Sequence, residues 1–390
     1  MKRTIASILT AFAILIGLAP RNAQACTTFC LKNKGEILFG KNYDWMVGDG
    51  LVFVNKRDVS KSASLEGTNP ARWVSRYGSV TFNQYGRENP SGGLNEAGLV
   101  IELMWLDETQ YPAEDSRPAL DVLEWIQYQL DTSATVAEVI ENSEKVRISS
   151  LVRLHYLVND KAGNSATIEF LNGKMVAHHG EALPFSTLTN DTYERSLNYS
   201  KATAVERARG NGSLERFTRA ARKADEFGKT ERAEAQAINY AFEILDNVAQ
   251  GNYTQWRIVY DQKRHKIHFR TLQAPQIKTI DAKAFDYSCG SIVKILDMNA
   301  KAAGDVTAKF TDYTRKANRE LIERSFNGTD FLRYLPAVVR EQLASYPEEF
   351  VCAAKESTPT TPTKPKTSAA ASAWWPAGLP VAQIILMFLV

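Results

Sequence analysis

The chain has 390 residues and a formal net charge of +3 at pH 7. This length is ample for a sizeable hydrophobic core, and a charge so close to balance argues against nucleic acid as a partner. The chain holds 4 cysteines and 5 histidines, too few cysteines for a disulfide-rich scaffold, and none of them is spaced like a set of metal ligands. We therefore predict a globular protein that uses no metal and no other cofactor.

Residues 1–25 have the features of a secretory signal peptide: a basic start, an apolar core at residues 5–18 and the small-residue cleavage pattern Ala23-Gln24-Ala25. Cleavage after this pattern makes Cys26 the first residue of an exported protein, periplasmic or secreted. A lipoprotein signal also ends before a cysteine, and Cys26 is then only a lipid anchor. Gln24 fits a lipoprotein signal poorly, which favours ordinary cleavage.

The mature chain is predicted to open with a β-hairpin, because residues 27–31 and 36–42 have strand character on either side of the turn Lys32-Asn33-Lys34-Gly35. Further strand patterns occur at residues 50–59, 80–82, 99–106, 151–159, 165–171, 174–178, 253–260 and 265–271. Helical patterns occupy residues 119–130, 135–144, 196–246 and 305–343. Hairpins and helices that alternate in blocks predict an α+β fold with antiparallel sheets.

The end of the chain differs from the rest. Residues 355–373 are rich in Thr, Pro, Ser and Ala, as in a linker, and residues 374–390 are apolar and uncharged. This apolar tail is short for a bilayer span, so membrane contact, a sorting signal and a docking tail all stay open for it. We therefore assign one domain to residues 26–354, between the signal peptide and the linker.

A cysteine at the N-terminus combines a nucleophile and a base in one residue. Its thiol attacks when deprotonated, and its α-amine, with a reference pKa of about 8, accepts the thiol proton near neutral pH. Because an antiparallel hairpin returns the chain to its start, we expect Lys41 and Asp44 beside Cys26. Asp44 would hold the α-ammonium and Lys41 would favour the thiolate. The alternative is a solvated hairpin end with an Asp in its turn.

Six short motifs support this hypothesis because they follow one another in a recognisable order, at residues 26–29, 39–45, 93–99, 188–190, 216–220 and 269–271. Together they resemble the choloylglycine hydrolase and penicillin V acylase family. The resemblance implies an N-terminal-nucleophile hydrolase with a four-layer αββα fold. It also implies hydrolysis of linear amide C–N bonds in a small-molecule substrate through a thioester acyl-enzyme, and assembly into a homotetramer.

The same resemblance implies roles for individual residues. Cys26 is then the nucleophile and its α-amine the base, while Asp44 holds that amine. Asn190 matches the asparagine whose amide lines the oxyanion hole. Arg216 matches the arginine of the active site, although Arg219 lies one turn away and leaves the assignment open.

Three further positions bear on activity and specificity. Lys41 stands where the family usually has Arg, so the planar fork is lost, and an inactive homologue is one alternative. Trp105 stands where the family contributes a backbone N–H to the oxyanion hole. Trp45 and Trp105 together resemble the penicillin V acylases of Gram-negative bacteria, and aromatic walls favour an apolar acyl group, such as phenoxyacetyl or the fatty acyl chain of an N-acyl homoserine lactone. The alternatives are a bile salt hydrolase and two ordinary core tryptophans.

Overall fold

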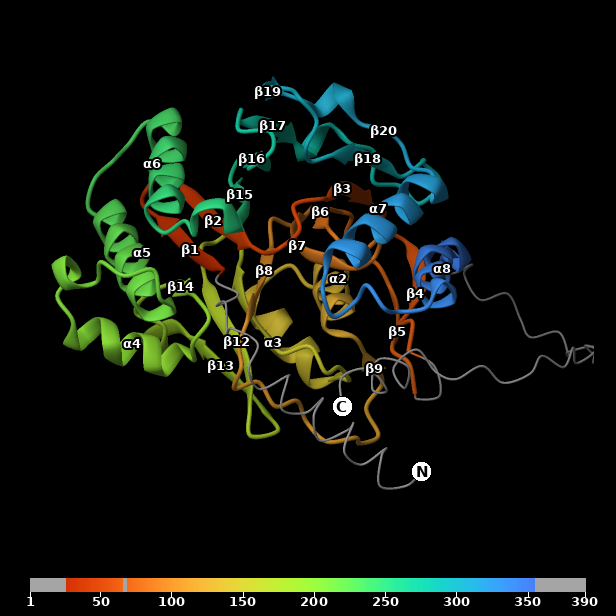
Figure 1. Ribbon diagram of the computed structural model, residues 1–390, viewed down its shortest axis with the longest axis horizontal. Coiled ribbons are helices and arrows are strands. Elements are labelled where there is room, and N and C mark those ends of the chain that lie inside the picture. Colours follow the sequence, from red (N-terminus) through yellow and green to blue (C-terminus); the bar gives the residue numbers. More distant parts are fainter. Residues whose placement is uncertain (1–25, 66–68, 355–390) are drawn as a thin grey trace, which may run out of the picture.

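The computed structural model describes residues 26–65 and 69–354 (Figure 1). The predicted signal peptide, linker and apolar tail lie outside the described residues. Within those two ranges, no helix is both long enough and apolar enough to cross a membrane. Two large β-sheets, with helices on their outer faces, make up most of the described chain.

One sheet has seven strands and contains the predicted hairpin. β1 (Thr27–Lys32) pairs antiparallel with β2 (Ile37–Asp44), and β2 pairs on its other side with β15 (Thr254–Asp261). β14 (Thr187–Leu188) lies beside β1 and forms one edge. The sheet continues beyond β15 through β16 (Lys266–Thr271), β17 (Lys278–Asp281) and β19 (Gly304–Asp305).

The other sheet has nine strands, with β11 (Leu154–Asn159), β8 (Val100–Trp105) and β7 (Pro90–Asn95) near its centre. Its other members are β13 (Lys174–His179), β12 (Ser165–Leu171), β6 (Ser79–Asn83), β3 (Leu51–Asn55), β18 (Lys294–Asp297) and β20 (Thr311–Asp312). Two short parallel strands, β9 (Ala119–Leu120) and β10 (Arg147–Ile148), pair apart from the large sheets.

The strand expected over residues 50–59 is wrong in its extent. It is divided into β3 and β4 (Val59–Ser62), because Asp58 has a φ of 60°, which no strand residue adopts. The break sends the chain out of the large sheet. β4 instead joins a small sheet with β5 (Arg72–Val74) and β21 (Val351–Cys352).

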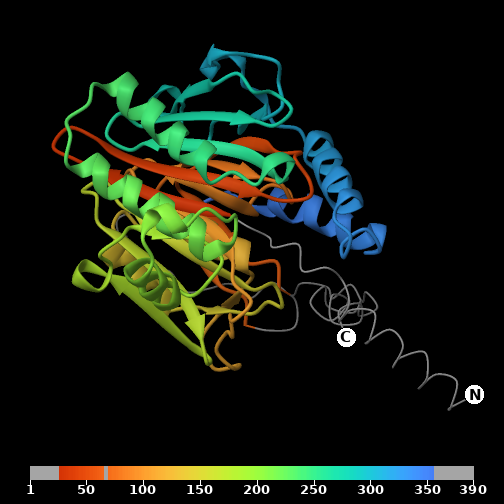
Figure 2. The same cartoon turned by 60° about the vertical axis from the view of Figure 1, so that its left-hand side comes forward.

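The two large sheets pack face to face, and helices cover their outer faces (Figure 2). α5 (Ser213–Gly228) and α6 (Glu234–Asn247) pack on β1 and β2, and α4 (Tyr193–Ala202) packs on α5. On the opposite side, α2 (Val122–Thr132) packs on β7 and α3 (Val136–Glu144) on β12. The predicted α+β fold with four αββα layers is thereby confirmed.

Side chains of β1 divide between two cores, as expected for a strand with a two-residue period. Phe29 and Leu31 point outward and share a hydrophobic cluster with Ala220 and Phe227 of α5. Cys26 and the other side chains on its face belong to the cluster between the two sheets. The hairpin therefore buries both of its faces, and Cys26 points into the interior of the sandwich.

α7 (Arg315–Gly328) and α8 (Ala337–Ser345) form a pair that we call the C-terminal helical hairpin, residues 315–345. The helix expected from residue 305 starts later, because the Thr314 side chain accepts a hydrogen bond from the backbone N–H of Ala317 and so caps α7. Arg340 of α8 forms an ion pair of 2.6 Å with Glu323 of α7, which ties the two helices together.

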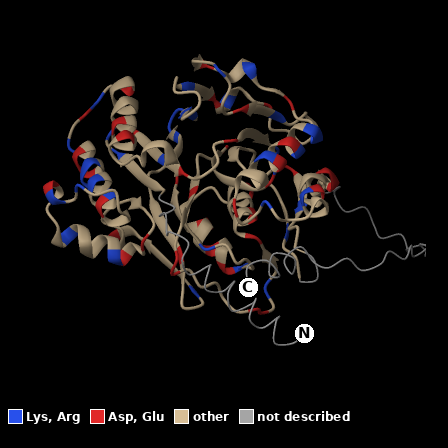
Figure 3. Cartoon of the chain, in the orientation of Figure 1, with Lys and Arg blue, Asp and Glu red and all other residues tan. Residues whose placement is uncertain are grey.

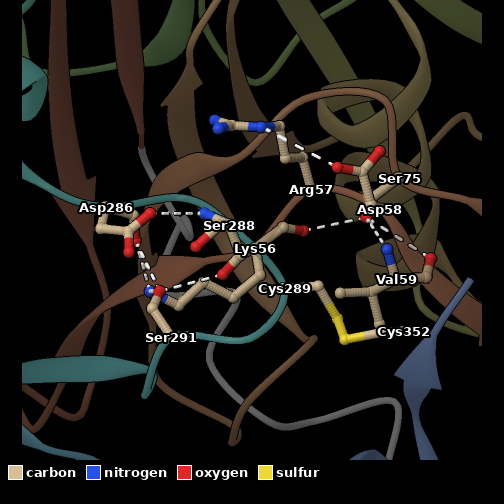
Figure 4. The surroundings of a disulfide bond; sticks show 10 residues. All are labelled: Lys56, Arg57, Asp58, Val59, Ser75, Asp286, Ser288, Cys289, Ser291 and Cys352. Atoms are coloured by element: carbon tan, nitrogen blue, oxygen red, sulfur yellow. Dashed lines mark hydrogen bonds and ion pairs between the residues drawn. A yellow bond between two sulfur atoms is a disulfide. The ribbon is translucent and has the colours of Figure 1, made fainter.

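Cys289 and Cys352 form a disulfide, while Cys26 and Cys30 are free thiols, so no disulfide blocks Cys26. Figure 4 shows that the bond lies beside a polar cluster in which Lys56 donates hydrogen bonds to Ser291 and to the carbonyl of Asp286. The loop closed by the disulfide contains the whole C-terminal helical hairpin. The end of the described chain is thus covalently attached to the body of the domain.

Charged residues of both signs are interleaved along α4, α5 and α6 on the outer face of the seven-stranded sheet (Figure 3). Several form ion pairs within or between neighbouring turns, such as Lys229 with Asp225 at 2.7 Å. This distribution agrees with the nearly balanced net charge of the sequence. These helices present a mixed, solvated surface.

Replacement of both Cys289 and Cys352 by Ser is expected to lower the free energy of unfolding by about 4 kcal/mol. The disulfide joins residues 63 apart, and closure of a loop of that length reduces the entropy of the unfolded chain by about this amount. Urea unfolding of the wild type and the double variant measures the difference. A reducing agent should destabilise only the wild type; a wild-type midpoint that is insensitive to reduction would contradict the prediction.

Candidate active site

The β1–β2 pairing places Cys26 against the end of β2, as the hairpin predicted. Thr27 lies opposite Asn42 and Thr28 opposite Lys41, so Cys26 continues toward Asp44. The Cys26 thiol donates a long hydrogen bond, 4.0 Å from Sγ to oxygen, to the backbone carbonyl of Asp44. Only 4% of Cys26 is exposed. The alternative of a solvated hairpin end is therefore wrong.

One carboxylate oxygen of the buried Asp44 has no hydrogen-bond partner among the described residues. It lies opposite Thr254 of β15, whose Oγ1 donates a hydrogen bond to Asp44 Oδ1. Among the described residues, Asp44 Oδ2 is buried and has no hydrogen-bond partner. Burial raises the pKa of Asp44 to about 6, although the Thr254 hydrogen bond and the charge of Arg216 oppose the shift. The carboxylate can thus accept a further, charged donor.

Arg216 approaches Cys26 from α5. Its Nη1 donates hydrogen bonds of 2.6 Å to the Cys26 carbonyl and to Thr27 Oγ1, and its Nη2 donates one of 3.1 Å to Asn190 Oδ1. Arg219, one turn later, donates instead to the carbonyls of Ala208 and Gly210. Of the two arginines that the sequence left open, the structure brings Arg216 to Cys26.

Asn190 lies two residues after the end of β14, and hydrogen bonds orient both its backbone and its side chain. Its backbone N–H donates to Ser213 Oγ at 2.9 Å, and its side-chain oxygen accepts from Arg216. Its Nδ2 donates to the backbone carbonyl of Trp105 at 2.9 Å. The amide group has a second N–H. The two residues predicted for the oxyanion hole, Asn190 and Trp105, are therefore in direct contact.

Lys41 approaches the site from inside the sandwich and is fully buried. Its Nζ donates a hydrogen bond to the carbonyl of Leu103 and lies 3.8 Å from Glu102 Oε2. Burial raises the pKa of the Cys26 thiol, and Lys41 is the strongest influence that lowers it; Asp44 raises it further and Arg216 lowers it. The structure thus brings a cation to the thiol from each side of the sheet.

Trp45 and Trp105 both line a cavity of about 330 Å³ that reaches Cys26. Trp45 is fixed by a 2.7 Å hydrogen bond from its Nε1 to Tyr85, and its ring meets Phe331 edge to face. Most of the cavity wall is apolar, and the C-terminal helical hairpin contributes Phe326, Phe331, Leu332, Leu335, Val339 and Leu343. The tryptophans are therefore more than ordinary core residues, since they face an open volume next to the thiol.

A second, wider depression of about 1120 Å³ lies elsewhere, lined by residues such as Thr135, Asp160 and His179. It contains none of the predicted site residues. Because the smaller cavity is lined by the free thiol of Cys26 together with Asp44, we assign the candidate active site to it. In the described ranges, no three His, Cys, Asp or Glu side chains are grouped as metal ligands.

Sequence reasoning missed Thr254 and the contribution of the C-terminal helical hairpin. The strand at residues 253–260 was predicted, and its pairing with β2 would have placed Thr254 beside Asp44. That pairing joins segments far apart in the chain, so local patterns do not specify it. The apolar faces of α7 and α8 likewise carry no sign of which surface they cover.

Comparisons with known proteins agree with this geometry. Residues 26–211 match the family described as linear amide C–N hydrolases, choloylglycine hydrolase family. The chain is 25% identical over 339 residues to a penicillin V acylase from Pectobacterium atrosepticum, covering 74% of this chain and 89% of that protein. The structure of penicillin V acylase from Agrobacterium tumefaciens superimposes with a TM-score of 0.67 and 29% identity, over 74% of this chain and 98% of the other.

A conjugated bile acid hydrolase from Clostridium perfringens shares the fold more distantly. Its structure superimposes with a TM-score of 0.60 and 19% identity, over 71% of this chain and 98% of that chain. The structure compared is that of a variant named R18L. At this level of identity the likeness is one of fold.

Replacement of Arg216 by Gln is expected to slow amide hydrolysis by roughly 10- to 100-fold, since charge-assisted hydrogen bonds of this kind contribute about 1.5–3 kcal/mol. The variant loses the bonds that join Cys26, Thr27 and Asn190. Arg219→Gln, one turn along the same helix, is the control and should retain activity. Equal losses in the two variants would show that the helix, rather than the Arg216 contacts, matters.

Proposed function

Because the chain belongs to the choloylglycine hydrolase family and is a linear amide C–N hydrolase, we propose that it acts, after export, as an N-terminal cysteine amidohydrolase of the penicillin V acylase kind. The observation that carries this proposal is the position of Cys26. Its thiol lies at the wall of an apolar cavity and beside Asp44, within a hydrogen-bonded set that includes Arg216 and Asn190.

Removal of residues 1–25 creates the catalytic base, because the α-nitrogen of Cys26 changes from an amide to an amine. The amine takes the thiol proton, and Sγ attacks the carbonyl carbon of the substrate amide. The new ammonium needs a hydrogen-bond acceptor. Asp44 contacts Cys26 and offers Oδ2, which has no partner among the described residues. Thr254 holds the other oxygen of Asp44 and so orients the carboxylate.

The tetrahedral intermediate places a negative charge on the former carbonyl oxygen. The Asn190 side-chain amide and the backbone N–H of Trp105 are the donors that we assign to this oxyanion. Arg216 accounts for the orientation of Asn190, since it binds the amide oxygen and leaves the nitrogen to face Trp105. Collapse expels the amine, which takes the proton from the α-ammonium. Water then attacks the thioester, releases the acid and restores the thiol.

The cavity supports an apolar acyl group as the part of the substrate that the protein binds. Cys26, Trp45 and Trp105 line the same cavity, and the C-terminal helical hairpin contributes aliphatic and aromatic residues to its wall. A phenoxyacetyl group and a fatty acyl chain both suit such walls. Penicillin V and long-chain N-acyl homoserine lactones are therefore the proposed test substrates, with a conjugated bile salt as the alternative.

Two observations bear on export and on the lipid-anchor alternative. The Cys289–Cys352 disulfide is the kind of bond that persists in oxidising compartments, which supports export. The Cys26 side chain is buried between the two sheets rather than placed on the surface, where a lipid anchor would meet a membrane. This burial argues against the use of Cys26 as an anchor.

Mature protein purified from an exporting host is expected to begin at an unmodified Cys26, and Cys26→Ala is expected to abolish amide hydrolysis. The reason is that one residue supplies both nucleophile and base. Mass spectrometry of the N-terminus and circular dichroism of the variant accompany the assay. Retained hydrolysis by a folded Cys26→Ala variant, or an acylated N-terminus, would sink this proposal.

Val339→Phe is expected to raise KM for a long-chain N-acyl substrate by roughly tenfold, because overpacking a buried site costs about 1–3 kcal/mol. Val339 is fully buried and lines the cavity, whereas the neighbouring Val338 is 59% exposed and does not. Val338→Phe is therefore the matched control. Penicillin V, glycocholate and a long-chain N-acyl homoserine lactone are compared with each variant. Equal KM values for the two variants would place the acyl group elsewhere.

A further inference from the structure

Three buried polar side chains, those of Lys41, Glu102 and Tyr260, meet in the hydrophobic layer between the two large sheets. Lys41 comes from β2 and Tyr260 from β15 of the seven-stranded sheet, while Glu102 comes from β8 of the opposite sheet. None of the three is more than 1% exposed. Of the three, only Lys41 has been connected with Cys26, as a cation that lowers the pKa of its thiol; Glu102 and Tyr260 have no role in the proposed mechanism.

The contacts form a chain that ends at Lys41. Tyr260 donates a hydrogen bond of 2.5 Å to Glu102 Oε1, and Glu102 Oε2 lies 3.8 Å from Lys41 Nζ. The Lys41 ammonium also donates to the Leu103 carbonyl and lies 3.8 Å from the Met104 sulfur. Three successive residues of β8 thus contact the ammonium.

The surrounding fold makes room for this carboxylate. A Cβ atom on Gly92 of β7 would lie only 2.2–2.4 Å from the Glu102 carboxyl group, so a larger residue at that position would displace it. Phe82 packs edge to face on the ring of Tyr260 and fixes it. A carboxylate held so closely in a hydrophobic core needs an explanation beyond stability, because buried ion pairs contribute little net stability compared with apolar residues.

The explanation follows from the chemistry of lysine. An arginine remains protonated when buried, whereas a buried lysine loses its proton unless a carboxylate opposes it. Burial raises the pKa of Glu102 to about 7, while Lys41 and the Tyr260 hydrogen bond lower it. The two opposite charges face each other at 3.8 Å in this buried layer. The titratable groups that face this pair are Tyr260, Tyr43, whose ring lies 5.8 Å from Lys41 Nζ, and Cys26.

We propose that Glu102, oriented by Tyr260, is a positioning residue that keeps Lys41 protonated and directed at Cys26. The proposal rests on the proposed function, in which Cys26 is the nucleophile. Lys41 is the strongest influence that favours the thiolate, so the loss of its proton weakens the nucleophile. Glu102 thus acts on catalysis through Lys41 without touching the substrate.

The test is the rate at which iodoacetamide alkylates Cys26 in the mature protein as a function of pH, followed on the Cys26 peptide by mass spectrometry. Glu102→Gln keeps the shape of the side chain and removes its charge. It should raise the apparent pKa of the Cys26 thiol by about one unit and lower kcat/KM at pH 7 roughly tenfold, with recovery at higher pH. Tyr260→Phe should shift the profile in the same direction by less.

Rescue by arginine separates this role from a structural one. In the Glu102→Gln background, Lys41→Arg should restore the lower thiol pKa, because a guanidinium needs no carboxylate to stay protonated. Glu88→Gln is the matched control, since Glu88 forms an equally buried 2.6 Å ion pair with Lys61. This control should lose stability and keep the Cys26 profile of the wild type.

Three results would overturn the proposal: a wild-type Cys26 profile in Glu102→Gln, an equal shift in Glu88→Gln, or no rescue by Lys41→Arg. If Glu102→Gln fails to fold, Tyr260→Phe is the test. This variant keeps the charges of Lys41 and Glu102 and removes only the hydrogen bond to Glu102, so an unchanged Cys26 profile would overturn the proposal. Activity that survives Cys26→Ala would refute the proposed function. An essential Cys26 with an unchanged Glu102→Gln profile would refute this inference alone.

Discussion

The site depends on the register of β1 against β2. This pairing sets Thr28 opposite Lys41 and carries Cys26 to the carbonyl of Asp44. Because successive residues of a strand point to opposite faces, the same register turns Thr27 outward to Arg216 and Cys26 inward to the cavity. A slip of one residue would exchange these faces and separate the thiol from its cations.

Because the Cys26 thiol is buried, its thiolate form depends on the positive charges of Lys41 and Arg216. The Cys26 thiol lies in a low-dielectric layer between sheets, which raises its pKa and disfavours the nucleophilic thiolate. Arg216 reaches it from the helical layer and Lys41 from the layer between the sheets, so each side of the seven-stranded sheet supplies one positive charge. The negative charge of Asp44 has the opposite effect on the thiol. Burial raises the pKa of Asp44, so the carboxylate beside Cys26 accepts a proton more readily than an exposed one.

Short-range patterns predicted the hairpin and hence Lys41 and Asp44, and motif resemblance predicted Asn190 and Arg216. Neither could predict Thr254, because its contact with Asp44 depends on the pairing of β2 with a strand near residue 254. Local patterns also missed the break at Asp58, since the left-handed backbone there leaves no mark in hydrophobic periodicity. Sequence reasoning thus located residues that lie together where the contact is local or carried by a motif, and missed contacts that depend on the tertiary fold.

The proposed acyl-binding wall comes from a different part of the chain than the proposed catalytic centre. The family match covers residues 26–211, whereas the wall facing Trp45 comes from the C-terminal helical hairpin, residues 315–345. The hairpin lies within the loop closed by the Cys289–Cys352 disulfide and is tied internally by Arg340 and Glu323. The proposed reaction therefore depends on β1, β2 and the residues that contact them, whereas the proposed choice of acyl group depends on the cavity wall that the C-terminal helical hairpin supplies.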